Sequence, residues 1–514
     1  MKKTALLLVC LALVRTAGAV ELSNLFTDGM VLQQGQPLPV WGWGEPGEQV
    51  FVEFAGQKQS CTTDSEGKWR VTLDSLKASA EERTFEVTGK STISVKGVLV
   101  GEVWLCSGQS NMAMALGEAD GGKEAMDHPD PLLRAFRVPE RPGERSYSNV
   151  GGSWGQFLLP ESRRWAATPY FFGKKLRETL GVPVGVVVCA WGGSSVTSWM
   201  SPQGLGELGP LLPEDVLGWR STIQFSRLYH GMLRPLVPYA LAGVAWYQGE
   251  TEAIESQNPF LYRQLFQALI RDWRSLWNRP ELPFYFVQLP MLAKHDDWPI
   301  VRESQAAALA LPVTGMISTI DLSQDKNLHP TNKKQFAERL ANLALGKTYG
   351  LNTWPGAPLF DKMAVEPDGS VRLQLHDASG LKTSDGNVPV GFQVAAAGGE
   401  FQAADARIEG ETMIVSNRVV KNPTAVRYAW AGSMKANVVN AAGLPLAPFR
   451  TDSRSMRGQG WRWESLPAKS KLPNAVTGVQ LSQEKAPGWK LEIQGGTQNL
   501  LLVWRVTWLL VVWL

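Results

Sequence analysis

The chain has 514 residues, and its 51 Lys and Arg against 48 Asp and Glu give a formal net charge of +3. Lys2, Lys3 and Arg15 account for that excess, so the rest of the chain is balanced, which excludes strong bulk attraction to nucleic acid. Hydrophobic residues make up 44% and charged residues 19%, which excludes a disordered chain. The length predicts about three domains. The 21 Trp favour a carbohydrate-handling protein, because exposed indole rings stack on sugars.

Residues 1–19 are predicted to be a signal peptide. Lys2 and Lys3 precede an apolar run, and Ala17-Gly18-Ala19 fits an A-x-A cleavage pattern. We therefore expect an exported protein, periplasmic or secreted, whose mature chain begins at Val20. The alternative is a short membrane anchor.

Two patterns follow along the chain. Residues 20–97 have strand-like runs between turn signals such as Glu45-Pro46-Gly47, which predicts a small all-β domain. Residues 98–350 alternate apolar runs with helical patterns such as Thr168–Leu180, which predicts an α/β domain with helices on both faces of a parallel sheet. Its five predicted strands are Val98–Cys106, Val182–Cys189, Leu241–Tyr247, Pro283–Leu289 and Thr314–Ile320.

Short strands return at residues 351–452, where turn signals such as Pro367-Asp368-Gly369 predict a second all-β domain. Residues 453–514 are expected to be a linker and an apolar tail. The tail at 500–514 is shorter than the ~20 residues that span a bilayer, so no transmembrane helix is predicted. An interfacial anchor with weak membrane association, a buried strand, and a tail without selected structure remain the alternatives.

The cysteines predict neither a disulfide framework nor a zinc site. Cys61, Cys106 and Cys189 are an odd number in the mature chain and show no metal-ligand spacing. We expect Cys106 and Cys189 to be buried free thiols, with a single bridge as the alternative.

Polar residues follow several predicted strands, at the edge where open α/β sheets place their sites. Ser110 comes after the first strand in Gly108-Gln109-Ser110-Asn111 and before a helix start, so its hydroxyl is a candidate nucleophile; the alternative is a simple helix cap. Gly192 and Gly193 follow the second strand and let the backbone approach a ligand closely, or form an ordinary turn. Gln248 and Glu250 follow the third, as a candidate oxyanion donor and neighbour, or as solvated loop residues.

His329 is the candidate base. A serine nucleophile needs a nearby base, most often His. Of the five histidines, His329 alone lies just past a predicted strand end and just before a predicted helix. The alternative is a surface or capping histidine.

These strand-end blocks, in this order, resemble the SGNH hydrolase superfamily, and their phrases resemble sialate O-acetylesterases and related carbohydrate acetylesterases. The resemblance covers about 21–452 and implies an SGNH-type, flavodoxin-like, three-layer fold flanked by two all-β domains. The segments that carry it are GEVWLCSGQSNM (101–112), PYFFGKKLRETLGVPVGVVVCAWGGSSVTSWMSP (169–202), LYHGMLRPLVPYALAGVAWYQGE (228–250), VRESQ (301–305) and NLHPTNKKQFAERLA (327–341).

The resemblance implies a role for each site residue. Ser110 would be the nucleophile and His329 the base and later the acid. Gly192 or Gly193 and the Gln248 side chain would stabilise the oxyanion beside the Ser110 N–H. No metal or organic cofactor is implied.

Three positions depart from the family pattern. The acid expected three residues before the histidine is Lys326, the second Asp of a D-I-G-D phrase is Gln324, and an Asn often found after Gln-Gly-Glu is Glu252. The first two leave open which group orients His329, and the third is expected to alter the substrate pocket. We favour Asp325, with Asp321 as an alternative and a Ser-His dyad as another.

The expected partner is an acetylated carbohydrate, most of all an O-acetylated sialic acid. Arg302 and Arg234 are candidates for contacting the sialic acid carboxylate, with structural ion pairs as the alternative, and Glu250 is a further candidate in the substrate pocket. Acetylxylan or another glycan is the alternative substrate. A non-catalytic glycan-binding protein is the alternative from another class.

Overall fold

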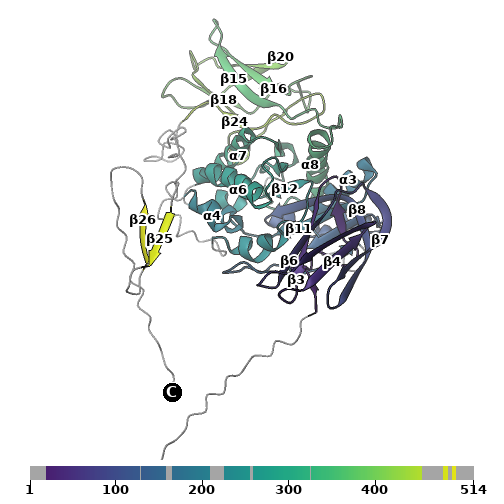
Figure 1. Ribbon diagram of the computed structural model, residues 1–514. Coiled ribbons are helices and arrows are strands. Elements are labelled where there is room, and N and C mark those ends of the chain that lie inside the picture. The colour runs from purple at the N-terminus through teal and green to yellow at the C-terminus, as the bar shows by residue number, and fades with distance from the viewer. Residues whose placement is uncertain are drawn as a thin grey trace, which may run out of the picture. The chain divides into compact units, whose positions relative to one another are not determined.

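The computed structural model describes residues 19–453 apart from 128, 158–164, 209–224, 255–258, 294 and 325, together with two strands near the C-terminus (Figure 1). The chain divides into two units, residues 1–452 and 453–514. In the second unit, β25 (Val479–Gln483) and β26 (Trp489–Ile493) form an antiparallel pair. Residues 1–18 of the predicted signal peptide and the apolar run at 500–514 lie outside the described residues.

A parallel sheet lies at the centre of the first unit. Its strands are buried throughout their parallel portions and mostly apolar, as expected of strands with both faces covered. They pair in the order β11 (Val184–Ala190), β8 (Thr92–Gly108), β12 (Gly243–Tyr247), β13 (Phe284–Val287) and β14 (Thr314–Ile317).

The complete sheet is larger and mixed. β9 (Leu133–Arg137) adds a parallel strand beyond β11, and β10 (Trp154–Gln156) pairs antiparallel with β9. The expectation of an α/β core flanked by β regions is confirmed in outline. The sequence analysis missed β9 because two of its five residues are arginines, and Arg134 reaches Glu82 in the N-terminal region at 2.8 Å.

Helices cover both faces of the sheet, and neighbouring residues of β12 show how. Trp246 packs against Phe266 and Trp273 of α6 (Tyr262–Leu276), whereas Tyr247 stacks on Phe336 of α8 (Lys333–Lys347). Successive side chains of a strand point to opposite faces. The α6 layer also holds α7 (Trp298–Ala307), and the α8 layer holds α3 (Ala167–Leu180), as Figure 1 shows.

The N-terminal region is all-β and shares a strand with the sheet. The first part of β8 pairs with β2 (Val31–Gln33) and β7 (Ser79–Thr88), and its last part pairs with β11 and β12. The predicted boundary at 97/98 therefore falls inside one continuous strand. The remaining strands here are β1 (Glu21–Leu22), β3 (Leu38–Trp43), β4 (Gln49–Phe54), β5 (Gln57–Thr62) and β6 (Lys68–Leu73).

Residues 351–452 form short antiparallel sheets with a hydrophobic cluster of their own, to which Met291 and Ile320 contribute from the α/β region. Arg450 also bonds Glu303 of α7 at 2.8 Å. The strands are β15 (Leu359–Val365), β16 (Val371–His376), β17 (Lys382–Thr383), β18 (Phe392–Ala395), β19 (Gln402–Ala403), β20 (Asp405–Glu409), β21 (Thr412–Ser416), β22 (Ala425–Tyr428), β23 (Val438–Val439) and β24 (Phe449–Arg450).

The short helices are α1 (Ser110–Ala113), η1 (Leu116–Glu118), α2 (Gly122–Met126), η3 (Val196–Trp199), α4 (Pro202–Gly206), η6 (Tyr229–Leu233), η7 (Arg234–Leu236), α5 (Glu250–Ile254), η8 (Pro259–Leu261), η9 (Ala308–Ala310) and η10 (Ile320–Leu322). None of the helices that the structure describes combines the length and the apolar character needed to cross a bilayer. Cys61, Cys106 and Cys189 are free thiols, and burial raises the pKa of Cys106 and Cys189.

Candidate active site

Ser110 and His329 come together at the carboxyl edge of the parallel strands. Ser110 begins α1 directly after β8, and His329 lies in the loop between β14 and α8. The Oγ of Ser110 is 2.8 Å from Nε2 of His329, although the two residues are 219 positions apart. A hydroxyl in hydrogen-bond contact with a half-exposed imidazole has the geometry of an activated nucleophile.

Two backbone segments with free N–H groups border this pair. Gly192 and Gly193 lie in the exposed turn after β11, and a Cβ placed on Gly192 would be 3.6 Å from Cβ of Ser110. Within the described part of the chain, the N–H groups of Ser110, Gly192 and Gly193 have no hydrogen-bond acceptor. They are therefore available to a negatively charged oxygen that develops beside Ser110.

A buried chain of polar side chains supports the site from behind. Asn111 donates from Nδ2 to Oε1 of Glu250 at 2.5 Å and to the backbone oxygen of Leu328 at 3.0 Å. Its Oδ1 accepts from the ammonium of Lys333 at 2.5 Å. Since Asn111 follows Ser110 and Leu328 precedes His329, this amide ties together the two segments that carry the pair.

Glu250 belongs to this buried chain and not to an exposed substrate pocket. Its side chain is 1% exposed, so the expectation that it contacts substrate is not supported. Burial raises the pKa of Glu250, and the Asn111 bond and the charge of Lys333 act against that rise. Burial also lowers the pKa of Lys333 to about 7, opposed by Glu250.

Gln248 is fully buried and its amide is already committed. Its Nε2 donates to the backbone oxygen of Ser194 at 3.1 Å and to Oε2 of Glu252 at 2.5 Å, while Oε1 accepts from Tyr262 at 2.9 Å. Both amide hydrogens therefore have acceptors, and the expected side-chain oxyanion donor is not what the structure shows. Gln248 instead holds the turn that carries Gly192 and Gly193.

Glu252 completes that support. Its Oε1 accepts from the backbone N–H of Val196 at 2.6 Å, so one carboxylate binds both Gln248 and the segment after the glycine turn. Burial raises the pKa of Glu252 to about 7, against the hydrogen bonds from Val196 and Gln248, which lower it.

None of the carboxylates that the structure describes contacts the ring of His329, so the group that orients this ring is not among them. Asp321 forms a two-pronged ion pair with Arg339 of α8, both distances being 2.9 Å, and faces that helix. Asp325 lies outside the described residues. Within the described residues, the ring hydrogen-bonds to Ser110 alone.

The charges around His329 favour its neutral form. Desolvation lowers the pKa of the imidazole, the positive charge of Lys333 lowers it further, and Glu118 acts in the opposite direction. Glu118 lies in η1, whose neighbour Asp120 donates from its backbone N–H to the oxygen of Thr331 at 2.9 Å. A neutral imidazole at pH 7 is the form that can accept the Ser110 proton.

Neither arginine candidate lies at the site. Arg302 has no exposed surface, and its guanidinium donates to backbone oxygens of Ala429 and Ala431 in the C-terminal β region. The expectation that Arg302 contacts the substrate carboxylate is therefore not supported. Arg234 is exposed but belongs to η7, in the segment before β12 and not in the loops that carry Ser110, Gly192 and His329.

Asn111 and Lys333 are the supporting residues that sequence reasoning missed. Lys333 opens a helix, where a lysine ordinarily faces solvent, and nothing local indicates its burial. Their only signal was their place inside the segments GQSNM and NLHPTNKKQF. Among the residues that the structure describes, no group of three or more His, Cys, Asp or Glu gathers in a way that could hold a metal ion.

Comparisons with known proteins agree with this geometry. Residues 100–346 match the family model of carbohydrate esterases described as sialic acid-specific acetylesterases. A sialate O-acetylesterase of Pongo abelii is 30% identical over 387 residues, which cover 65% of this chain and 72% of that protein. The sialate O-acetylesterase of Mus musculus is 28% identical over 506 residues, covering 82% and 92%.

A solved structure is similar over most of this chain. The crystal structure of a carbohydrate acetylesterase from Xanthomonas citri is 36% identical, covers 85% of this chain and 100% of its own, and superimposes with a TM-score of 0.79. The fold, the serine–histidine pair and these matches define the class: the chain is a carbohydrate esterase. More narrowly, it belongs to the sialate O-acetylesterase family.

Proposed function

We propose that this esterase removes O-acetyl groups from sialic acids by a serine acyl-transfer mechanism on an SGNH-type frame. The observation that carries the mechanism is the 2.8 Å contact between Ser110 Oγ and His329 Nε2, beside three backbone N–H groups that have no acceptor among the residues that the structure describes. The sialic acid substrate is favoured by the mammalian relatives and by the family model, both of which are named for it.

In the first half-reaction, Ser110 Oγ attacks the acetyl carbonyl carbon while His329 Nε2 takes the hydroxyl proton. The negative charge on the former carbonyl oxygen is stabilised by the N–H groups of Ser110 and of Gly192 or Gly193. The tetrahedral intermediate collapses, the bond to the sugar oxygen breaks, and His329 protonates that oxygen. The sugar leaves as an alcohol and an acetyl-serine remains.

In the second half-reaction, water replaces the sugar. His329 takes a proton from the water, the resulting oxygen attacks the acetyl-serine, and collapse of the second intermediate returns the proton to Ser110 and releases acetate. The buried chain of Glu250, Asn111 and Lys333 holds Ser110 and His329 in register throughout. We further propose that the protein is exported, as its N-terminal sequence indicates.

A second substrate class is favoured by one observation. Arg302, the cation expected to meet a sialic acid carboxylate, is buried under the C-terminal β region. The Xanthomonas relative, moreover, is titled only as a carbohydrate acetylesterase. A neutral glycan such as acetylxylan is therefore the second candidate.

Acetate release from an O-acetylated sialic acid and from acetylxylan, compared at equal acetyl concentration, tests the substrate. We expect the sialic acid to be preferred; preference for acetylxylan would establish the second candidate. Ser110→Ala tests the mechanism on either substrate and should lower kcat by orders of magnitude with an unchanged circular dichroism spectrum. Retention of more than about a tenth of the turnover would mean that Ser110 is not the nucleophile, since a tenfold loss is only ~1.4 kcal/mol of barrier.

A further inference from the structure

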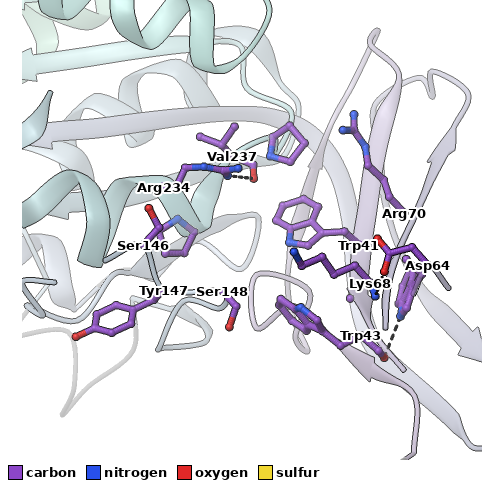
Figure 2. A pocket seen from close by; sticks show the side chains of 14 residues that line it. Trp41, Trp43, Asp64, Lys68, Arg70, Ser146, Tyr147, Ser148, Arg234 and Val237 are labelled. Carbon is purple, nitrogen blue, oxygen red and sulfur yellow. Dashed lines mark hydrogen bonds between the residues drawn. The ribbon is translucent and has the colours of Figure 1, made fainter. Parts of the chain in front are cut away.

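A cavity of about 530 Å³ lies between the N-terminal β region and the α/β region (Figure 2). One wall is the outer face of the sheet formed by β1, β3 and β6. The facing wall is made of residues 146–148 and of the segment 234–238 that leads into β12. Both belong to the first unit of the chain.

The cavity shares no lining residue with the candidate active site. Ser110 follows the carboxyl end of β8, whereas Val237 and Pro238 precede the amino end of β12, which runs parallel to β8. At about 3.3 Å per residue, the five residues of β12 alone span roughly 15 Å. Different segments of the chain therefore line the cavity and carry Ser110 and His329.

Two tryptophans form an aromatic surface on the sheet wall. Trp41 and Trp43 are alternate residues of β3, so both point to the same face, and both are half-buried. The residue between them, Gly42, faces inward, where an added Cβ would lie 2.6 Å from the ring of Trp69. Phe26 meets the Trp41 ring edge-on at 5.0 Å and fixes its orientation. Fixed, partly exposed indole rings suit the apolar C–H face of a sugar.

Cations border these rings on both walls. In the register of β3 and β6, Arg70 is opposite Trp41 and Lys68 is opposite Trp43, so each tryptophan has a cationic neighbour on the same face. Arg234 extends from the facing wall, as Figure 2 shows. Asp64 is the one acid among the lining residues, and its Oδ1 already accepts from the backbone N–H groups of Glu66 and Lys68.

We propose that this cavity is a non-catalytic binding site for a sialylated glycan. Trp41 and Trp43 stack against the sugar rings, and Arg70 and Arg234 bind the carboxylate of the sialic acid. Arginine suits this role because its planar guanidinium matches a carboxylate with two parallel hydrogen bonds. The choice of an acidic over a neutral glycan follows from Arg70 and Arg234, because Lys68 already pairs with Glu66, and it rests in part on the proposed substrate. The site would hold the enzyme on a sialoglycan while Ser110 acts.

Calorimetric titration of the Ser110→Ala protein with 3′-sialyllactose tests the proposal, and lactose is the neutral probe. We expect binding of sialyllactose, at least tenfold weaker binding of lactose, and at least tenfold weaker sialyllactose binding after Trp43→Ala or Arg70→Ala. Trp191→Ala, at the active-site turn, and the exposed Arg418→Ala are matched controls that should retain binding. Unchanged affinity in the cavity variants, or equal affinity for lactose, would overturn the proposal.

A second readout separates this proposal from the proposed activity. In the active protein, which keeps Ser110, Trp43→Ala should leave kcat for a small aryl acetate within about twofold of the value for the unsubstituted protein. A large fall would show that the cavity acts on the catalytic centre and is not an independent site. If sialyllactose binds through Trp43 and Arg70 while O-acetylated sialic acid is not hydrolysed, the proposed substrate fails and the binding site stands.

Discussion

The ammonium of Lys333 lies 2.5 Å from Oδ1 of Asn111, directly behind the residue that carries the candidate nucleophile. Lys333 has no exposed surface, and its charge acts on His329 as well as on Glu250. One buried cation therefore links the supporting amide, the buried carboxylate and the base.

Burial of His329, together with the charge of Lys333, should set the acid limb of the pH profile. His329 must be neutral to accept a proton, and because its pKa is lowered, kcat/KM should fall off only at a pH below the ordinary 6.5. Lys333→Met removes a charge that lowers the pKa and should move the limb to higher pH. Glu118→Gln removes a charge that raises the pKa and should move it to lower pH. Lys334→Met, at an exposed neighbouring lysine, is the control; shifts of equal size and sign in both lysine variants would contradict this account.

The orienting acid can be found by comparing two aspartates. Asp321 is held by Arg339, so Asp321→Asn should leave kcat within about threefold and cost about 1 kcal/mol of stability or less. Asp325 is the acid that remains in the loop before His329, and Asp325→Asn should lower kcat strongly by favouring the wrong tautomer. Measurement of kcat and Tm for both variants decides. If neither lowers kcat, the enzyme works with a Ser-His dyad.

Gln248 should act through position and not through direct contact with the oxyanion. Because its amide holds Ser194 and Glu252, Gln248→Ala should lower Tm and reduce kcat by about tenfold, less than the 10²–10³ typical of a lost oxyanion donor. Gln374→Ala, at an exposed glutamine, is the matched control for Tm. A loss of 10² or more in kcat at an unchanged Tm would return Gln248 to the oxyanion site.

Glu252 should make the folded state depend on pH. Its pKa of about 7 in the folded state exceeds the ordinary value of 4.5, so the folded protein binds more protons between these two values. The contribution of Glu252 to the free energy of unfolding is therefore greatest below pH 4.5 and is lost as the pH rises through 7. This contribution is about 3 kcal/mol at most. Calorimetry between pH 5 and 8 should show a flatter Tm profile for Glu252→Gln than for the parent. The exposed Glu281→Gln should keep the parental slope, and an unchanged slope in Glu252→Gln would remove this role.

The sequence predicted the residues whose place is fixed by local pattern. Ser110 follows an apolar strand, and His329 alone among the histidines stands between a strand and a helix, so topology brings them to one edge. The buried residues that support the site could not be predicted in the same way. Burial of Lys333 and Arg302 depends on segments far along the chain, on Asn111 in one case and on residues 429–431 in the other. The two amide hydrogens of Gln248 likewise meet acceptors that no local spacing reveals.

The shared strand β8 has a mechanical consequence. The N-terminal β region cannot be removed at residue 98 without stripping hydrogen-bond partners from the strand that delivers Ser110, because β2 and β7 pair along the same 17-residue segment. Because β8 is continuous from Thr92 to Gly108, a displacement of the N-terminal region at Thr92 would also displace the segment that carries Ser110. The N-terminal region and the esterase core should therefore unfold together as one cooperative unit. A chain shortened to begin at residue 98 should lose activity because β8 has lost its pairing with β2 and β7, even though every side chain of the site is still present.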